Sequence, residues 1–196
     1  GDVETARVLL DAGADVNDGA ASGTSALVIA AHSGHGTLGI YLLEQGADPS
    51  AAGAGYTALH AAVLRSQIEL VAALLDHGAD LNAVIEHGTA GRRFSADYSI
   101  RRQLIGTDAF WLAAKYGEVE ILSLLVERGA DPLVVRSNMT ALQVGMGNSG
   151  SGLENRRDRI GNAPPDQAEE EQRTLELARI LIDLGVDVNA TSRRGD

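Results

Sequence analysis

The stretch GYTALHAAVLRSQIELVAALLDHGADLNA at residues 55–83 combines two helical patterns with a glycine stop, and most of the chain repeats this arrangement. Thr57 is the predicted N-cap, because its hydroxyl can accept hydrogen bonds from the free N–H groups of a first helical turn. The alanine-rich run 58–64 predicts a short helix that is packed on two sides. Apolar residues within 68–77 fall on one broad helical face, which predicts a second helix that ends at Gly78.

The phrase that closes this unit recurs along the chain, as Gly-Ala-Asp in four copies and Gly-Val-Asp in the last. Its glycines are separated by 33, 32, 51 and 56 residues, and they are Gly13, Gly46, Gly78, Gly129 and Gly185. A chain that repeats itself at an interval near 33 residues is a stack of equivalent units, not one globular core. The two longer intervals indicate inserts.

This pattern resembles the ankyrin repeat family. The resemblance rests on TALHAA at 57–62, AAHSGH at 30–35 and GADVN at 13–17. It implies an all-α solenoid in which antiparallel helix pairs stack side by side and hairpin loops project at right angles. It also implies a role in protein recognition, generally without catalysis.

We therefore expect a single ankyrin repeat domain over residues 1–196. Its predicted parts are a partial repeat at 1–19 and repeats at about 20–52, 53–83, 84–135 and 136–191. Both ends of such a stack expose apolar faces that neighbouring repeats would cover. This leaves an alternative open, in which the chain is a structural spacer of a longer array without a binding site of its own.

The chain is acidic, with 16 basic and 27 acidic side chains and a formal net charge of −11. An acidic surface repels phosphate groups, so we expect no binding to nucleic acid or to an anionic membrane. The chain has no cysteine, which excludes disulfides, thiolate metal sites and thiol catalysis. No apolar run approaches the roughly 18 residues that a membrane span needs. We expect a monomer, and the compartment stays open.

The first insert, at about 84–106, falls where the resemblance places a hairpin finger. It is basic and aromatic, and it contains Arg92, Arg93, Phe94, Tyr98, Arg101 and Arg102. Arginine and aromatic residues are enriched at interface hot spots. Two interpretations stay open: the insert contacts a partner, or Phe94, Tyr98 and Ile100 only pin a long loop onto the stack.

The second insert, at about 148–172, lies between the two helices of the last repeat. The stretch is rich in glycine, proline and charge, which is typical of a flexible and solvated loop. Its acidic end predicts an N-terminal extension of the last helix, where negative charge suits the helix dipole.

Three features suggest chemistry, but each has a structural explanation. Residues 145–150 spell GxGxxG, yet the buried strand that a dinucleotide fingerprint needs is missing before them. His32 and His35 are too few to hold zinc, which takes three or four ligands. His60 occupies the histidine position of the family motif, where the imidazole resembles a structural group. We expect no enzyme activity, no cofactor and no metal.

The predicted function is a non-catalytic protein–protein interaction module that binds through the finger insert and the concave face of the inner helices. Trp111 replaces the motif histidine, and it either packs between units and against the first insert or anchors a partner. Tyr56, Arg65, Lys115 and Tyr116 match family positions on the side where partners usually bind. The candidate partner-binding residues are Tyr56, Arg65, Arg92, Arg93, Phe94, Tyr98, Trp111, Lys115 and Tyr116.

Overall fold

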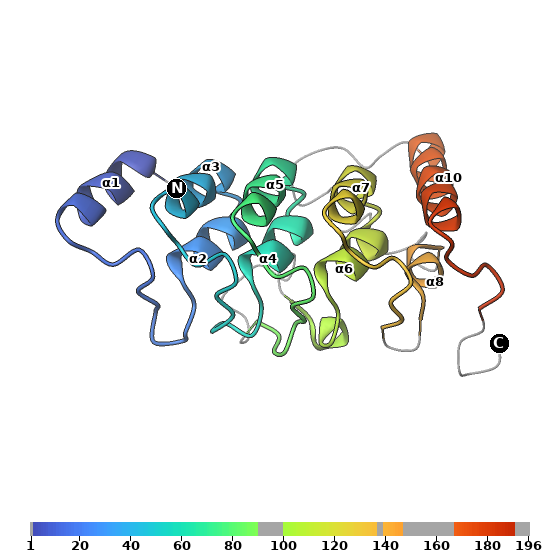
Figure 1. Cartoon of the computed structure of the whole chain (residues 1–196), viewed down its shortest axis with the longest axis horizontal. Helices are drawn as coiled ribbons and strands as arrows, with labels where there is room; N and C mark the ends of the chain where they lie inside the picture. Colours follow the sequence, from blue (N-terminus) through green and yellow to red (C-terminus); the bar gives the residue numbers. More distant parts are fainter. Residues whose placement is uncertain (1, 90–99, 137–138, 147–166, 191–196) are drawn as a thin grey trace.

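The computed structural model describes residues 2–89, 100–136, 139–146 and 167–190. Helices in these ranges form two rows (Figure 1). The first helix of each pair, here called inner, is α2 (Ala26–His32), α4 (Ala58–Leu64), α6 (Ala109–Tyr116) or α8 (Ala141–Met146). The second, here called outer, is α1 (Val3–Asp11), α3 (Gly36–Glu44), α5 (Ile68–Asp76), α7 (Val119–Glu127) or α10 (Gln167–Asp183). A short 3-10 helix, η1 (Arg102–Leu104), lies in the first insert.

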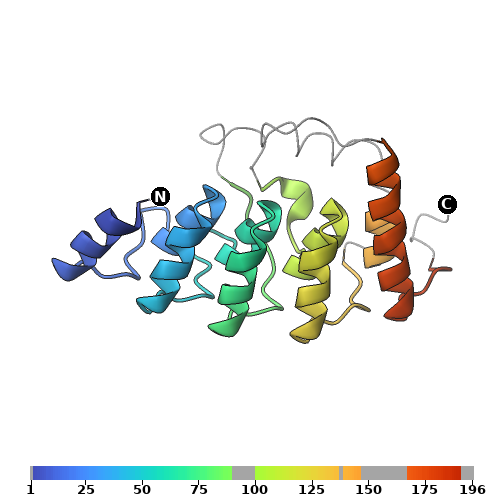
Figure 2. The same cartoon turned by 90° about the horizontal axis from the view of Figure 1, so that it is seen from above.

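The helix pairs stand side by side along the long axis of the molecule (Figures 1 and 2). Each inner helix packs against the next inner helix, and each outer helix contacts its outer neighbours. The loops that lead from one pair to the next, here called fingers, project beyond the inner row (Figure 1). The described residues contain no extended strand, only the isolated bridges Gly19–Ser25 and Arg136–Met139. The predicted all-α solenoid is confirmed.

Small side chains allow the inner helices to pack on two sides. Ala30, Ala62 and Ala113 occupy the same position in three successive inner helices, and all three are buried. A larger residue there would separate adjacent helices, because protein interiors tolerate little added volume. The outer row supplies leucines at one repeated position, and they are buried at Leu42, Leu74, Leu125 and Leu181.

Each outer helix ends in the same turn, as the repeated Gly-Ala-Asp predicts. The five glycines have φ between +85° and +97°, in the left-handed region that glycine adopts at little cost. The Asp that stands two residues after each glycine accepts, with its carboxylate, the backbone N–H of the second residue beyond it. The pairs are Asp15–Asn17, Asp48–Ser50, Asp80–Asn82, Asp131–Leu133 and Asp187–Asn189. The repeated phrase therefore encodes one turn five times.

The first insert starts and ends on a finger, where the sequence places it. Ile85 donates its N–H to the Thr107 carbonyl at 2.9 Å, and its own carbonyl accepts the N–H of Gly106 at 2.7 Å. Ile85, Ile100 and Leu104 are buried, so the described parts of the insert pack firmly on the stack. Ile100 packs as the pinned-loop interpretation expects, whereas Phe94 and Tyr98 lie outside the described residues.

The second insert lies largely outside the described residues, but its acidic end is helical. Helix α10 has 17 residues, compared with nine in each of the other outer helices. The extra turns lie at its N-terminal end, from Gln167 onward, as the sequence predicts.

Candidate partner-binding face

The starts of the inner helices α4, α6 and α8 are tied to the fingers that follow them, and His60 in α4 shows the clearest case. Its Nδ1 lies 3.1 Å from the Thr57 backbone nitrogen and 2.8 Å from the Thr57 hydroxyl. Its Nε2 lies 3.0 Å from the carbonyl oxygen of Ala83, in the next finger. The Thr57 N–H can only donate, so Nδ1 accepts and Nε2 carries the proton that it donates to Ala83.

Burial keeps this imidazole neutral. Loss of solvation on burial lowers the pKa of His60 to about 4, against smaller opposing effects from the Ala83 and Thr107 backbone and from Asp108 and Asp80. His60 is fully buried and forms part of the core. The structural role predicted for this histidine agrees with both observations.

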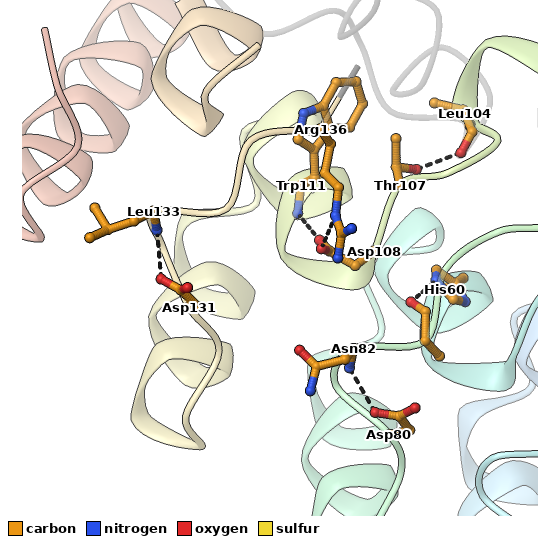
Figure 3. A network of polar contacts seen from close by, with 11 residues as sticks. His60, Asp80, Asn82, Leu104, Thr107, Asp108, Trp111, Asp131, Leu133 and Arg136 are labelled. Carbon is orange, nitrogen blue, oxygen red and sulfur yellow. Dashed lines mark hydrogen bonds and ion pairs between the residues drawn. The ribbon is translucent and has the colours of Figure 1, made fainter. Parts of the chain in front are cut away.

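Two other units make the same connection with different chemistry. Gln143 accepts the Thr140 N–H at 2.9 Å and donates its amide N–H to the Ala190 carbonyl at 2.6 Å. In the unit of α6, which lies between the units of His60 and Gln143, Asp108 accepts the Trp111 N–H at 2.8 Å. Asp108 also forms an ion pair with Arg136 of the next finger at 2.9 Å (Figure 3). In these three units a side-chain contact links the start of the inner helix to the next finger.

Trp111 is packed, not displayed. Its side chain is 5% exposed, and its Nε1 has no hydrogen-bond partner among the described residues. Of the two interpretations of Trp111, the structure favours packing. The Lys115 Nζ lies 5.6 Å from the centre of its ring.

The other candidates on the described part of the chain lie at the ends of inner helices and on a finger. Arg65 follows α4, and Tyr116 occupies the equivalent position at the end of α6. Both are partly exposed, as is Lys115, whose pKa is lowered by burial. Tyr56 is buried on its finger, and its hydroxyl lies 3.3 Å from Nδ1 of His32. Tyr56 and Trp111 therefore offer a partner almost no surface in this arrangement.

Four of the predicted residues, Arg92, Arg93, Phe94 and Tyr98, lie outside the described residues. The described flanks of their insert are placed at the fingers, since Glu86 and His87 both donate N–H groups to the Gly55 carbonyl, at 2.8 and 3.2 Å. The described flanks of the insert therefore lie beside the finger that carries Gly55.

The structure also shows a pocket on this face that was not predicted. It has a volume of about 710 Å³ and lies between two successive fingers, the end of α2 and the insert. His32 and Ser33 are among its lining residues. Their equivalents in the next units are Leu64 and Arg65, then Lys115 and Tyr116, so the pocket and the candidate residues lie on one repeated face.

A model of the ankyrin repeat family, in three copies, matches residues 1–85, and a single ankyrin repeat model matches residues 106–137. The chain belongs to the ankyrin repeat family. Ankyrin repeats are generally protein–protein interaction modules and are typically non-catalytic. Comparison with curated proteins finds no match to this chain.

The ankyrin layout continues past the matched residues. Helices α8 and α10 form a further ankyrin helix pair that packs against α6 and α7. The Gly185 turn and the Gln143 connection repeat the features of the earlier units. The last unit therefore extends the ankyrin stack on structural grounds.

The described part of the ankyrin stack contains no group of three or more His, Cys, Asp or Glu residues arranged to hold a metal ion. It also contains no helix that is long and apolar enough to cross a membrane. Gly145, the first glycine of the GxGxxG motif, lies inside α8, and the later glycines lie outside the described residues.

Proposed function

We propose that this ankyrin stack is a non-catalytic module that binds a protein partner through the inner face, defined here as the fingers with the first insert and the ends of the inner helices. The observation that carries the proposal is the way the insert is attached. It departs from a finger through paired backbone hydrogen bonds at Ile85, and it buries Ile85, Ile100 and Leu104. The described ends of the insert, at 84–89 and 100–106, are therefore built into this face.

The charge of the insert supports contact with a partner. Arg101 and Arg102 are exposed on η1 and its N-cap, in a chain whose net charge is −11. At the ends of the inner helices, Arg65 and Lys115 add two more cations to the same face. The described ends of the insert carry Arg101 and Arg102 against Glu86, so their local charge is opposite in sign to that of the whole chain and favours one orientation of an approaching partner.

Affinity capture with a designed variant tests this function. Replacing Arg92, Arg93, Phe94 and Tyr98 by alanine should abolish capture of partners that the unmodified chain retains, since hot-spot residues contribute most of the binding energy. The matched control replaces Arg156, Arg157, Arg159 and Ile160 in the second insert by alanine. Equal capture by the unmodified chain and the finger variant would contradict the proposed use of the insert.

A second candidate function is a structural spacer within a longer array. It is favoured by apolar residues that stay exposed near both ends of the described stack, namely Val8, Leu9, Leu175, Ile182 and Val188. A spacer would be stabilised by flanking repeats and would capture no partner of its own.

A further inference from the structure

The pocket on the inner face is bordered by segments that approach each other closely at glycines. Between the first two fingers, a Cβ on Gly23 or on Gly53 would lie closer than 3.0 Å to the backbone of the other glycine. On the far side, a Cβ on Gly55 would meet His87 of the insert at 2.5 Å. Side chains at these positions would push the walls apart.

The first insert lines the pocket beside the two fingers and the end of α2. Residues 87–89 line the pocket, and they are held by the bond from the His87 N–H to the Gly55 carbonyl. Thr89 donates its N–H to the Ile100 carbonyl at 3.1 Å, which closes the described base of the insert beside the pocket. A Cβ on Gly88 would meet the same Ile100 oxygen at 2.5 Å. The insert therefore limits a surface that would otherwise run on along the fingers.

The lining is uncharged and largely apolar. No aspartate, glutamate, lysine or arginine occurs among the described residues that line the pocket. Ile29 contributes an apolar surface that is 49% exposed, although its equivalents Ala61 and Leu112 are buried. The lining also includes four residues with hydroxyl groups, Ser22, Thr24, Ser33 and Thr89. The walls also carry two imidazoles, His32 and His87.

One cationic and one anionic residue lie next to the lining of the pocket. The guanidinium group of Arg65 lies against Gly34, which follows Ser33, and Glu86 precedes His87. These neighbours give no net preference for an anion or a cation. A charged ligand group at this largely apolar lining would lose part of its hydration without gaining a matched counter-ion.

We infer that the pocket binds a short uncharged segment of the protein partner that carries aliphatic or aromatic side chains. This inference rests on the proposed function and names the chemistry of the partner at one part of the inner face. A volume of about 710 Å³ is within the range of ligand sites, which are mainly apolar with a few polar groups that fix orientation. The hydroxyl groups fill that orienting role by hydrogen bonding the backbone of the segment.

A selection from a phage library of random linear peptides tests the inference. The unmodified chain is the target, and the selected peptides are then measured against two pocket variants, Ser33→Trp and Ile29→Asp. Ser33→Trp fills the pocket from an exposed lining position, and Ile29→Asp adds a charge to its wall. The matched control is Thr37→Trp, at an exposed position of α3 that does not line the pocket. Circular dichroism verifies that each variant is folded.

The expected peptides are rich in uncharged aliphatic or aromatic residues. Their affinity should fall at least about tenfold with both pocket variants and stay unchanged with Thr37→Trp. Peptides that are mainly acidic or basic, or that bind all variants equally, would overturn the pocket assignment and leave the proposed function standing. A selection that yields no binding peptide also overturns it. The finger variant described above then decides the proposed function separately.

Discussion

At the scale of single residues, one position in the repeat performs one task with different side chains. His60 and Gln143 are the fourth residues of equivalent motifs, and each accepts an N–H from its own cap and donates to the next finger. An amide offers an acceptor and a donor, as a neutral imidazole does. Trp111 lacks an acceptor, and there the Asp108–Arg136 ion pair makes the connection instead.

Because His60 is neutral in the folded chain, its stability contribution depends on pH. The pKa is about 4 in the folded state and about 6.5 in an unfolded chain, so between these values the unfolded state binds more protons. The free energy of unfolding should therefore fall by about 3 kcal/mol from this residue as the pH drops from above 6.5 to 4. Urea titrations at several pH values measure this slope.

His60→Gln should remove this part of the pH dependence and keep the fold at pH 7, because Gln143 already makes the same two connections. The control His35→Gln makes the same substitution at an exposed histidine and keeps His60 in place. An unchanged slope in His60→Gln would show that the imidazole does not titrate as its burial requires.

At the scale of elements, the outer helices all end by the same backbone device. For each of the five turn glycines, an added Cβ would find no atom within 4 Å. Their positive φ is therefore the whole reason for glycine at these sites. The helix stop is local, which is why a short sequence phrase predicts it.

Gly78→Ala should lower the free energy of unfolding by about 1 kcal/mol, since alanine must adopt a left-handed conformation without any clash. Gly19→Ala is the control, because Gly19 lacks a positive φ and an added Cβ there makes only ordinary contacts. Its effect should stay within about 0.5 kcal/mol. Chemical denaturation compares the two, and equal losses would contradict the backbone explanation.

Local signals made the helices predictable, whereas the pocket depends on segments that are far apart in the sequence. The cap at Thr57 and the stop at Gly78 lie next to the helices they delimit, and the predicted helices agree with α4 and α5 to within one residue. Gly23 and Gly53, by contrast, look like ordinary loop glycines. Their role appears only when two fingers are placed together. The burial of Tyr56 is equally a property of the stack.

At the scale of the whole molecule, local stability varies from repeat to repeat along the stack. Each unit of such a stack contacts only its neighbours, so its stability depends on how many sides are covered. Helix α1 belongs to a unit without an inner helix and has no buried residue. Helices α4 and α5 lie in the interior of the stack, and every residue of α4 is buried.

The difference in local stability between the end and the interior of the stack can be measured at one repeated leucine position of the outer helices. Leu9 in α1 is 56% exposed, and its equivalent Leu74 in α5 is fully buried. Leu74→Ala should lower the free energy of unfolding by about 2–5 kcal/mol, and Leu9→Ala by less than about 0.5 kcal/mol. Hydrogen exchange in the unmodified chain should show the fastest amides in α1 and the slowest in α4 and α5, because sparsely packed segments open locally. Uniform protection along the stack, together with equal losses at the two leucines, would mean that the stack unfolds as one cooperative unit.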